Sequence, residues 1–185
     1  MKRNYRLLVV IFFISVLRSE AQQIPDYLNC VKINQLAREA CHNCYQKGDP
    51  NLPSISSALD LTGYTINAES TLVISPNATE FEVVFGFAPD ILTGTNSPAD
   101  SNGDDNLELV DPFGEVVDAF GVVGEDGSGT NHEFQNGRAL RNSTVFEGNP
   151  VYTFTEWIIY NDTGDSGTIN QSQNAPDDFT PGNRN

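Results

Sequence analysis

Residues 107–120, LELVDPFGEVVDAF, hold two short runs of branched and aromatic residues with a turn between them. The turn, Asp111-Pro112-Phe113-Gly114, has Asp at its first position, Pro at its second and Gly at its fourth, which is typical of a type I turn. Leu107 and Leu109 alternate with a charged residue, as expected for a strand with one buried face. The stretch therefore predicts an antiparallel hairpin with strands at Leu107–Val110 and Glu115–Phe120.

Further strands are predicted on both sides of this hairpin. Period-two alternation, with turn residues at the ends, predicts them at Leu59–Ile66, Thr71–Ile74, Glu82–Phe87, Arg138–Leu140 and Tyr152–Tyr160. From Asn161 onward the composition is polar and lacks apolar periodicity, which predicts a loosely held tail pinned near its end by Phe179. Residues 58–160 are therefore predicted to form an all-β antiparallel domain, and residues 161–185 a polar tail.

The first residues have the composition of a secretory signal. Three basic residues precede an 11-residue run, Leu7 to Leu17, that is apolar except for Ser15, and small residues follow at Ser19 and Ala21. A membrane-spanning helix needs about 20 apolar residues, whereas a signal peptide needs fewer. We expect residues 1–21 to be a signal peptide and the mature protein to be secreted, extracellular and without a membrane span; an N-terminal membrane anchor is the alternative.

The chain is strongly acidic. It carries 10 Lys+Arg against 25 Asp+Glu, a formal charge of −15. Removal of residues 1–21 takes four basic residues and one acidic residue, which leaves 6 against 24, a charge of −18. Binding to nucleic acid depends largely on Lys and Arg, so no nucleic-acid partner is expected. An acidic surface favours cations or basic partners.

All three cysteines, Cys30, Cys41 and Cys44, lie between residues 22 and 57. Residues 34–45 have helical composition, and a spacing of three places Cys41 and Cys44 on one helical face. A zinc site would need further ligands, and a redox role would need a different fold around the CxxC. In a secreted chain we expect a structural disulfide with its pairing open, and the third cysteine could link two copies as a homodimer.

Several of these segments resemble the lamin-tail domain family. The matching segments are the DLTGYTI strand at 60–66, Ser70–Ile74, Phe81–Phe87, the NGDD-x-LEL motif at 102–109, VVDAFG at 116–121, ALR at 139–141 and Glu156-Trp157-Ile158. The resemblance covers roughly residues 59–160. It implies an immunoglobulin-like antiparallel β-sandwich, of the type found in secreted members, with the cysteine-containing helical segment in front of it.

One strand of the family pattern is missing. Family members usually begin with a strand of the IELYN type ahead of the DLSGY strand, and this chain has the cysteine-containing segment there. One edge of the sheet is therefore open or completed by another segment. An open edge strand invites pairing with a partner.

The loop before the hairpin is the sharpest candidate metal site. Asp100, Asn102, Asp104 and Asp105 offer several oxygen atoms, which are the ligands that calcium prefers. The loop lacks the full twelve-residue calcium pattern, and the nearby Glu125-Asp126-Gly127 loop could add oxygens. The structural alternative is a turn in which Asp side chains hydrogen-bond loop amides. Apart from this possible calcium ion, no cofactor is expected.

No catalytic constellation is present in the sequence. The two histidines, His42 and His132, accompany no nucleophile elbow, metalloprotease motif or phosphate-binding loop, and a solvated position is expected for His132. Aromatic residues in the predicted strands are assigned to the core. We therefore expect the protein not to be an enzyme.

Four Asn-x-Ser/Thr sequons fall in predicted loops or the tail, at Asn77, Asn142, Asn161 and Asn170. Together with the signal peptide they favour a secreted, acidic, non-catalytic interaction or matrix module with an extracellular protein partner. A calcium-dependent surface or adhesion protein is one alternative. An accessory subunit of a secreted nuclease or hydrolase is another, because lamin-tail domains are often attached to secreted nucleases.

Overall fold

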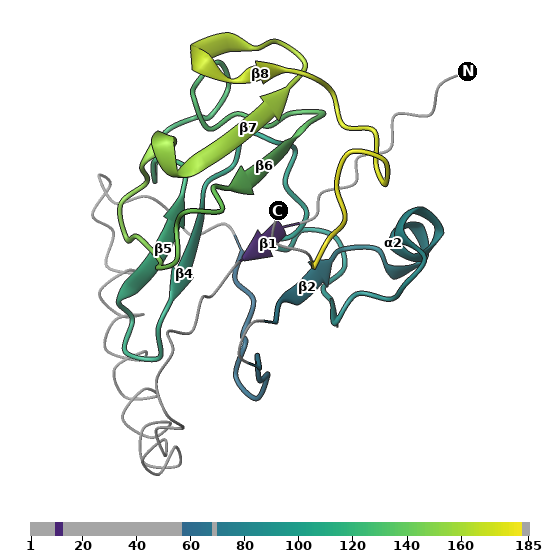
Figure 1. Cartoon of the computed structure of the whole chain (residues 1–185). Coiled ribbons are helices and arrows are strands. Elements are labelled where there is room, and N and C mark those ends of the chain that lie inside the picture. The colour runs from purple at the N-terminus through teal and green to yellow at the C-terminus, as the bar shows by residue number, and fades with distance from the viewer. Residues whose placement is uncertain (1–9, 13–56, 68–69, 183–185) are drawn as a thin grey trace.

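The computed structural model describes residues 10–12, 57–67 and 70–182 as a β-rich fold with few helices (Figure 1). The strands of these residues form three small sheets. The strands are β1 (Val10–Phe12), β2 (Leu72–Ser75), β3 (Ile91–Leu92), β4 (Leu107–Val110), β5 (Val116–Phe120), β6 (Arg138–Arg141), β7 (Trp157–Asn161) and β8 (Ile169–Asn170). The helices are α2 (Ala78–Phe85) and the single-turn 3₁₀ segments η1 (Phe154–Glu156) and η2 (Asp165–Gly167).

The predicted hairpin is confirmed. Strand β4 pairs antiparallel with β5 in a register that places Leu107 opposite Phe120. In the turn, Gly114 donates its N–H to the Asp111 carbonyl over 3.0 Å, and the Asp111 carboxylate accepts the amide of Phe113 over 2.8 Å. Gly114 has a φ of 91°, which a side chain would disfavour. The turn chemistry therefore sets this part of the fold.

The other two sheets have mixed pairing. In one, β2 lies between β1, which is antiparallel to it, and β3, which is parallel. In the other, β7 lies between the antiparallel β6 and the parallel β8. The predicted strands Thr71–Ile74, Arg138–Leu140 and the second half of Tyr152–Tyr160 are thus present as β2, β6 and β7.

The strand predicted at Glu82–Phe87 is wrong, because the segment belongs to helix α2. The Asn77 side chain caps this helix by accepting the Glu80 amide, and Gly86 ends it in the left-handed conformation with a φ of 78°. Phe81 and Phe85 are four residues apart, so they share one helical face and pack with ring centroids 4.8 Å apart.

The strand predicted at Leu59–Ile66 is also wrong. In the described residues 57–67 the chain forms turns, with Tyr64 donating its N–H to the Leu61 carbonyl and Thr62 to the Asp60 carboxylate. Leu59 and Leu61 still contribute to the core, because they pack against Ile74, Ile91 and Ala99. The apolar pattern therefore predicted burial but not the backbone conformation.

The C-terminal residues up to Gly182 are held firmly against the fold, which corrects the prediction of a loose tail. Strand β8 pairs with β7, placing Ile169 beside Tyr160. The buried Asp178 carboxylate lies 2.6 Å from the Arg138 guanidinium. Phe179 is 9% exposed and contacts Phe85, with ring centroids 5.6 Å apart, so its predicted anchoring role is confirmed.

A second hydrophobic cluster joins strands β5 and β7 to a loop between β5 and β6. Its buried members are Phe120, Phe134 and Ile159, from β5, a loop and β7. Partly buried residues packed against them are Leu107, Ala139, Tyr152, Phe154 and Trp157. The Phe120 ring meets the Trp157 ring edge-on with centroids 4.8 Å apart, a favourable aromatic geometry. The cysteine-containing segment 22–56, with Cys30, Cys41 and Cys44, lies outside the described residues.

Candidate functional site

A buried charge network joins three of the segments that carry the sequence motifs. Arg141 on β6 lies 2.9 Å from the Asp118 carboxylate on β5 and 2.8 Å from the Glu156 carboxylate next to β7. The side chain of Arg141 is only 5% exposed, and its guanidinium lies over the Trp157 ring at 4.7 Å. Two carboxylates thus share one cation, which also stacks on an aromatic face.

The segment before β7 completes this network. The Asn149 amide N–H donates to the Asp118 carboxylate over 2.9 Å, and its side-chain Nδ2 donates to Glu156 over 2.9 Å. Arg141 also donates to the Glu147 carbonyl. Asp118, Arg141 and Glu156 therefore all have hydrogen-bond partners within the fold, and the network links β5, β6 and the segment before β7.

Arg138, the other basic residue in the described ranges, is also buried. Its guanidinium pairs with Asp178 and lies over the Tyr160 ring, 3.8 Å from the centroid. Within 10–12, 57–67 and 70–182 the only Lys or Arg residues are Arg138 and Arg141. Both have side chains that are at most 8% exposed. The part of the surface that the structure describes therefore presents carboxylates and no exposed cationic side chain.

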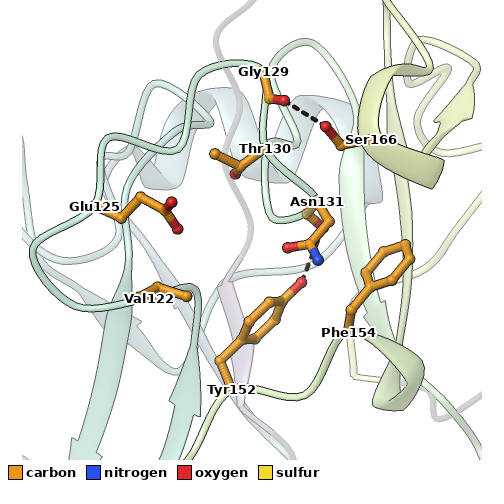
Figure 2. Close-up of a pocket in the computed structure, with 8 residues that line it drawn as sticks. All are labelled: Val122, Glu125, Gly129, Thr130, Asn131, Tyr152, Phe154 and Ser166. Carbon is orange, nitrogen blue, oxygen red and sulfur yellow. Dashed lines mark hydrogen bonds between the residues drawn. The ribbon is translucent and has the colours of Figure 1, made fainter.

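An open pocket of about 510 Å³ lies between the loop that follows β5 and the segment that leads into β7 (Figure 2). It is lined by Val122, Glu125, Gly129, Thr130, Asn131, Tyr152, Phe154 and Ser166. Figure 2 shows Glu125 on one wall and Phe154 opposite, with Tyr152 between them. The lining residues come from three separate parts of the chain, so no local sequence pattern predicts the pocket.

Two polar side chains of the pocket, those of Glu125 and Asn131, are available to a ligand, whereas two others are already hydrogen-bonded. The Tyr152 hydroxyl donates to the Asn131 carbonyl over 2.9 Å, and the Ser166 hydroxyl to the Gly129 carbonyl. By contrast, the hydrogen bonds found for Glu125 within the described residues use its backbone. In Figure 2 the Asn131 side chain lies near both aromatic rings, and the Glu125 carboxylate lies on the side of Tyr152 that is away from Phe154. A carboxylate beside aromatic faces suits a positively charged group.

His132 contacts two residues that line the pocket, Thr130 and Tyr152, and is fully buried, which corrects the expectation of a solvated histidine. Its Nδ1 lies 2.9 Å from the Thr130 hydroxyl, and its ring packs edge-on against Phe120 and Tyr152. Burial lowers the pKa of His132, and the charge of Glu125 opposes this shift only in part. A neutral, solvent-excluded imidazole fits packing rather than proton transfer to a substrate. Burial also disfavours the charged form of Tyr152 and so raises the pKa of its hydroxyl.

The acidic loop 100–105 is built into the fold by its backbone. Gly103, with a φ of 106°, accepts the Phe134 amide over 2.7 Å, and the Asp104 carbonyl accepts the Gly127 amide. The Asp104 carboxylate accepts the Ser128 hydroxyl, and the Asp100 carboxylate accepts the Asn96 amide. A side chain at Gly103 would lie 2.4 Å from the backbone of Gln135. These contacts give the loop a structural role.

No metal site forms in the parts of the chain that the structure describes, judged by groups of three or more His, Cys, Asp or Glu side chains. Asn102 and Asp105 are exposed, and calcium binding by the four predicted residues stays a prediction. Within the same residues no helix is long and apolar enough to cross a membrane.

The four sequons differ in their accessibility. Asn77 and Asn170 are exposed and Asn142 is half-buried. Asn161 is completely buried, and its Nδ2, the atom that a glycan would modify, donates to the Glu133 carbonyl over 3.1 Å. A glycan on Asn161 would have to displace this buried side chain. Glycosylation at the four sequons stays a prediction.

In comparisons with protein-family models, curated proteins and solved structures, this chain matched none. Its function must therefore be argued from the chemistry of the pocket and of the surface around it.

Proposed function

We propose that this protein is a secreted, non-catalytic interaction module that binds a basic segment of an extracellular protein partner. The observation that carries the proposal is the combination of a carboxylate and two aromatic rings in the pocket with a surrounding described surface that exposes no cation. A Lys or Arg side chain gains a counter-ion from Glu125 and stacking from Tyr152 and Phe154. Stacking of a cation on an aromatic face contributes about 0.5–2 kcal/mol to the binding free energy.

The charge of the whole chain supports the same partner. Removal of the predicted signal peptide leaves 6 basic against 24 acidic residues, so the formal charge changes from −15 to −18. Long-range attraction of this kind raises the association rate of a basic partner and weakens in salt. The predicted signal peptide and the accessible sequons support an extracellular location, where such a partner would be met.

We also propose that the fold is a lamin-tail type β-sandwich. The motif segments support it, because Asp118, Arg141 and Glu156 meet in one buried network. The residues of the second hydrophobic cluster support it as well, since Phe120 on β5 packs against Ile159 on β7. A solved structure in which the β4-β5 sheet and the β6-β7-β8 sheet do not lie face to face would refute this assignment.

A binding experiment tests the proposed function. The mature protein is titrated with a Lys-rich peptide and with the same peptide after acetylation of every lysine. We expect binding of the first peptide only, weakened by salt and reduced roughly tenfold by Glu125→Gln, a loss of about 1.4 kcal/mol. Glu82→Gln, a matched loss of one exposed charge on α2, should lower the affinity far less. Equal effects of the two substitutions would contradict a role for the pocket.

A further inference from the structure

Strand β2 has one edge whose partner is expected to be removed from the mature protein. In the structure this edge pairs with β1, and Val10, Ile11 and Phe12 lie opposite Ile74, Val73 and Leu72 (Figure 1). Residues 10–12 belong to the apolar run of the predicted signal peptide. Cleavage after Ala21 would take β1 away, so the inference rests on the proposed secretion.

The backbone groups at this edge then need new partners. Val73 donates its N–H to the Asp90 carboxylate over 2.7 Å and accepts the Asp90 amide over 2.8 Å, so its polar groups point toward β3. Successive residues of a strand direct these groups to opposite sides, which points those of Leu72 and Ile74 toward β1. Ile74 is 6% exposed. Buried N–H and C=O groups without partners are costly and are rarely left unpaired.

The strand that occupies this edge in the structure has three successive apolar residues, because β1 is Val-Ile-Phe, and we expect its replacement to be similarly apolar. The predicted N-terminal segment of the mature protein, residues 22–57, has no three consecutive apolar residues. Strand β2 itself has them, as Leu72-Val73-Ile74. A second copy of β2 running antiparallel reproduces the register of β1, with Leu72 opposite Ile74, Val73 opposite Val73 and Ile74 opposite Leu72.

We propose that the mature protein forms a two-fold symmetric dimer in which the β2 strands of two copies pair antiparallel about Val73. The same patch serves both subunits, as a two-fold interface requires. Leu72 and Ile74 of each copy exchange backbone hydrogen bonds with their counterparts, and β3-β2-β2-β3 becomes one continuous sheet. The leader strand β1 occupies this edge before cleavage and so keeps the precursor monomeric.

The first test compares two natural forms of the chain under reducing conditions, which removes any cysteine-linked dimer. Light scattering coupled to size exclusion should give twice the monomer mass for residues 22–185, decreasing on dilution, and the monomer mass for the full chain. A mature protein that stays monomeric over the concentration range overturns the proposal, whether its own N-terminal segment or another protein then covers β2.

A cross-linking pair keeps the test independent of the leader. Residues opposite each other in a non-hydrogen-bonded antiparallel pair have Cα atoms about 4.5 Å apart, within reach of a disulfide. Val73→Cys should therefore give a covalent dimer under mild oxidation. Val83→Cys is the control, because Val83 on α2 is 81% exposed and lies off the interface. Equal cross-linking by both variants, or none by Val73→Cys, overturns the proposal.

Failure of the dimer and failure of the proposed function are separable. The mass of the secreted chain shows whether residues 1–21 are removed, and the peptide titration with Glu125→Gln tests the pocket. Neither readout depends on the pairing of β2.

Discussion

Arg141 on β6 and Asp118 on β5 form a buried ion pair 2.9 Å apart, and Glu156 shares the same guanidinium. Arg141→Met keeps much of the side-chain volume but leaves the two carboxylates without a cation. Breaking a buried pair from one side typically costs about 3–5 kcal/mol. We expect a loss of this size in the free energy of unfolding, measured by urea denaturation. Glu108→Gln on the exposed face of β4 is the control and should change it by less than about 0.5 kcal/mol.

The burial of His132 predicts an acid-sensitive fold. Its pKa is lowered from the usual 6.5 in the folded protein, so the unfolded chain takes up a proton first as the pH falls. The contribution of His132 to stability is therefore complete above about pH 6.5 and is lost below it. His132→Leu should flatten the pH dependence of unfolding between pH 8 and roughly 5. An unchanged slope in the variant would show that carboxylates alone cause the acid sensitivity.

Glycan mapping tests the accessibility of the sequons. After expression in a eukaryotic host, we expect glycans at Asn77, Asn142 or Asn170 and none at Asn161, because the Nδ2 of Asn161 is buried and hydrogen-bonded. Mass spectrometry of the glycopeptides gives the answer. Asn161→Gln should also destabilise the fold by about 1–3 kcal/mol, since it leaves buried partners unpaired. A glycosylated, folded Asn161 would contradict the position of β7.

Calcium distinguishes the two roles considered for the acidic loop. If Asp100, Asn102, Asp104 and Asp105 serve the loop structure, millimolar calcium and a chelator should give the same Tm. A ligand at a hundredfold excess over its Kd would stabilise the fold by about 2.7 kcal/mol, so binding would be visible. A calcium-dependent rise that is lost in Asp104→Ala with Asp105→Ala would revive the adhesion-protein alternative.

Local chemistry explains which elements could be predicted from the sequence. The hairpin of β4 and β5 is specified by its own turn, through Asp111 and Gly114, so it does not depend on tertiary contacts. The segment with Phe81 and Phe85 is compatible with either periodicity, and the cap at Asn77 together with packing against Phe179 selects the helix.

The pocket could not be predicted in this way. The sequence identifies Glu125 only as a source of further oxygen ligands for a metal ion. Asn131, Tyr152 and Ser166 come from segments far apart in the chain. Its position depends on how the loop after β5 and the segment before β7 are brought together in the fold. In the sequence, only the motif segments that contain Asp118, Arg141 and Glu156 indicated the buried network, because no spacing rule places these three residues together.

The central claim is that the pocket at Glu125 and Tyr152 receives a basic side chain, and nuclear magnetic resonance tests it most directly. Amide shifts of the mature protein are followed while a Lys-rich peptide is added. The account predicts that the largest changes fall on residues 122–131 and 152–154 and vanish with the acetylated peptide. Changes spread evenly over the acidic surface, or centred on α2, would contradict it.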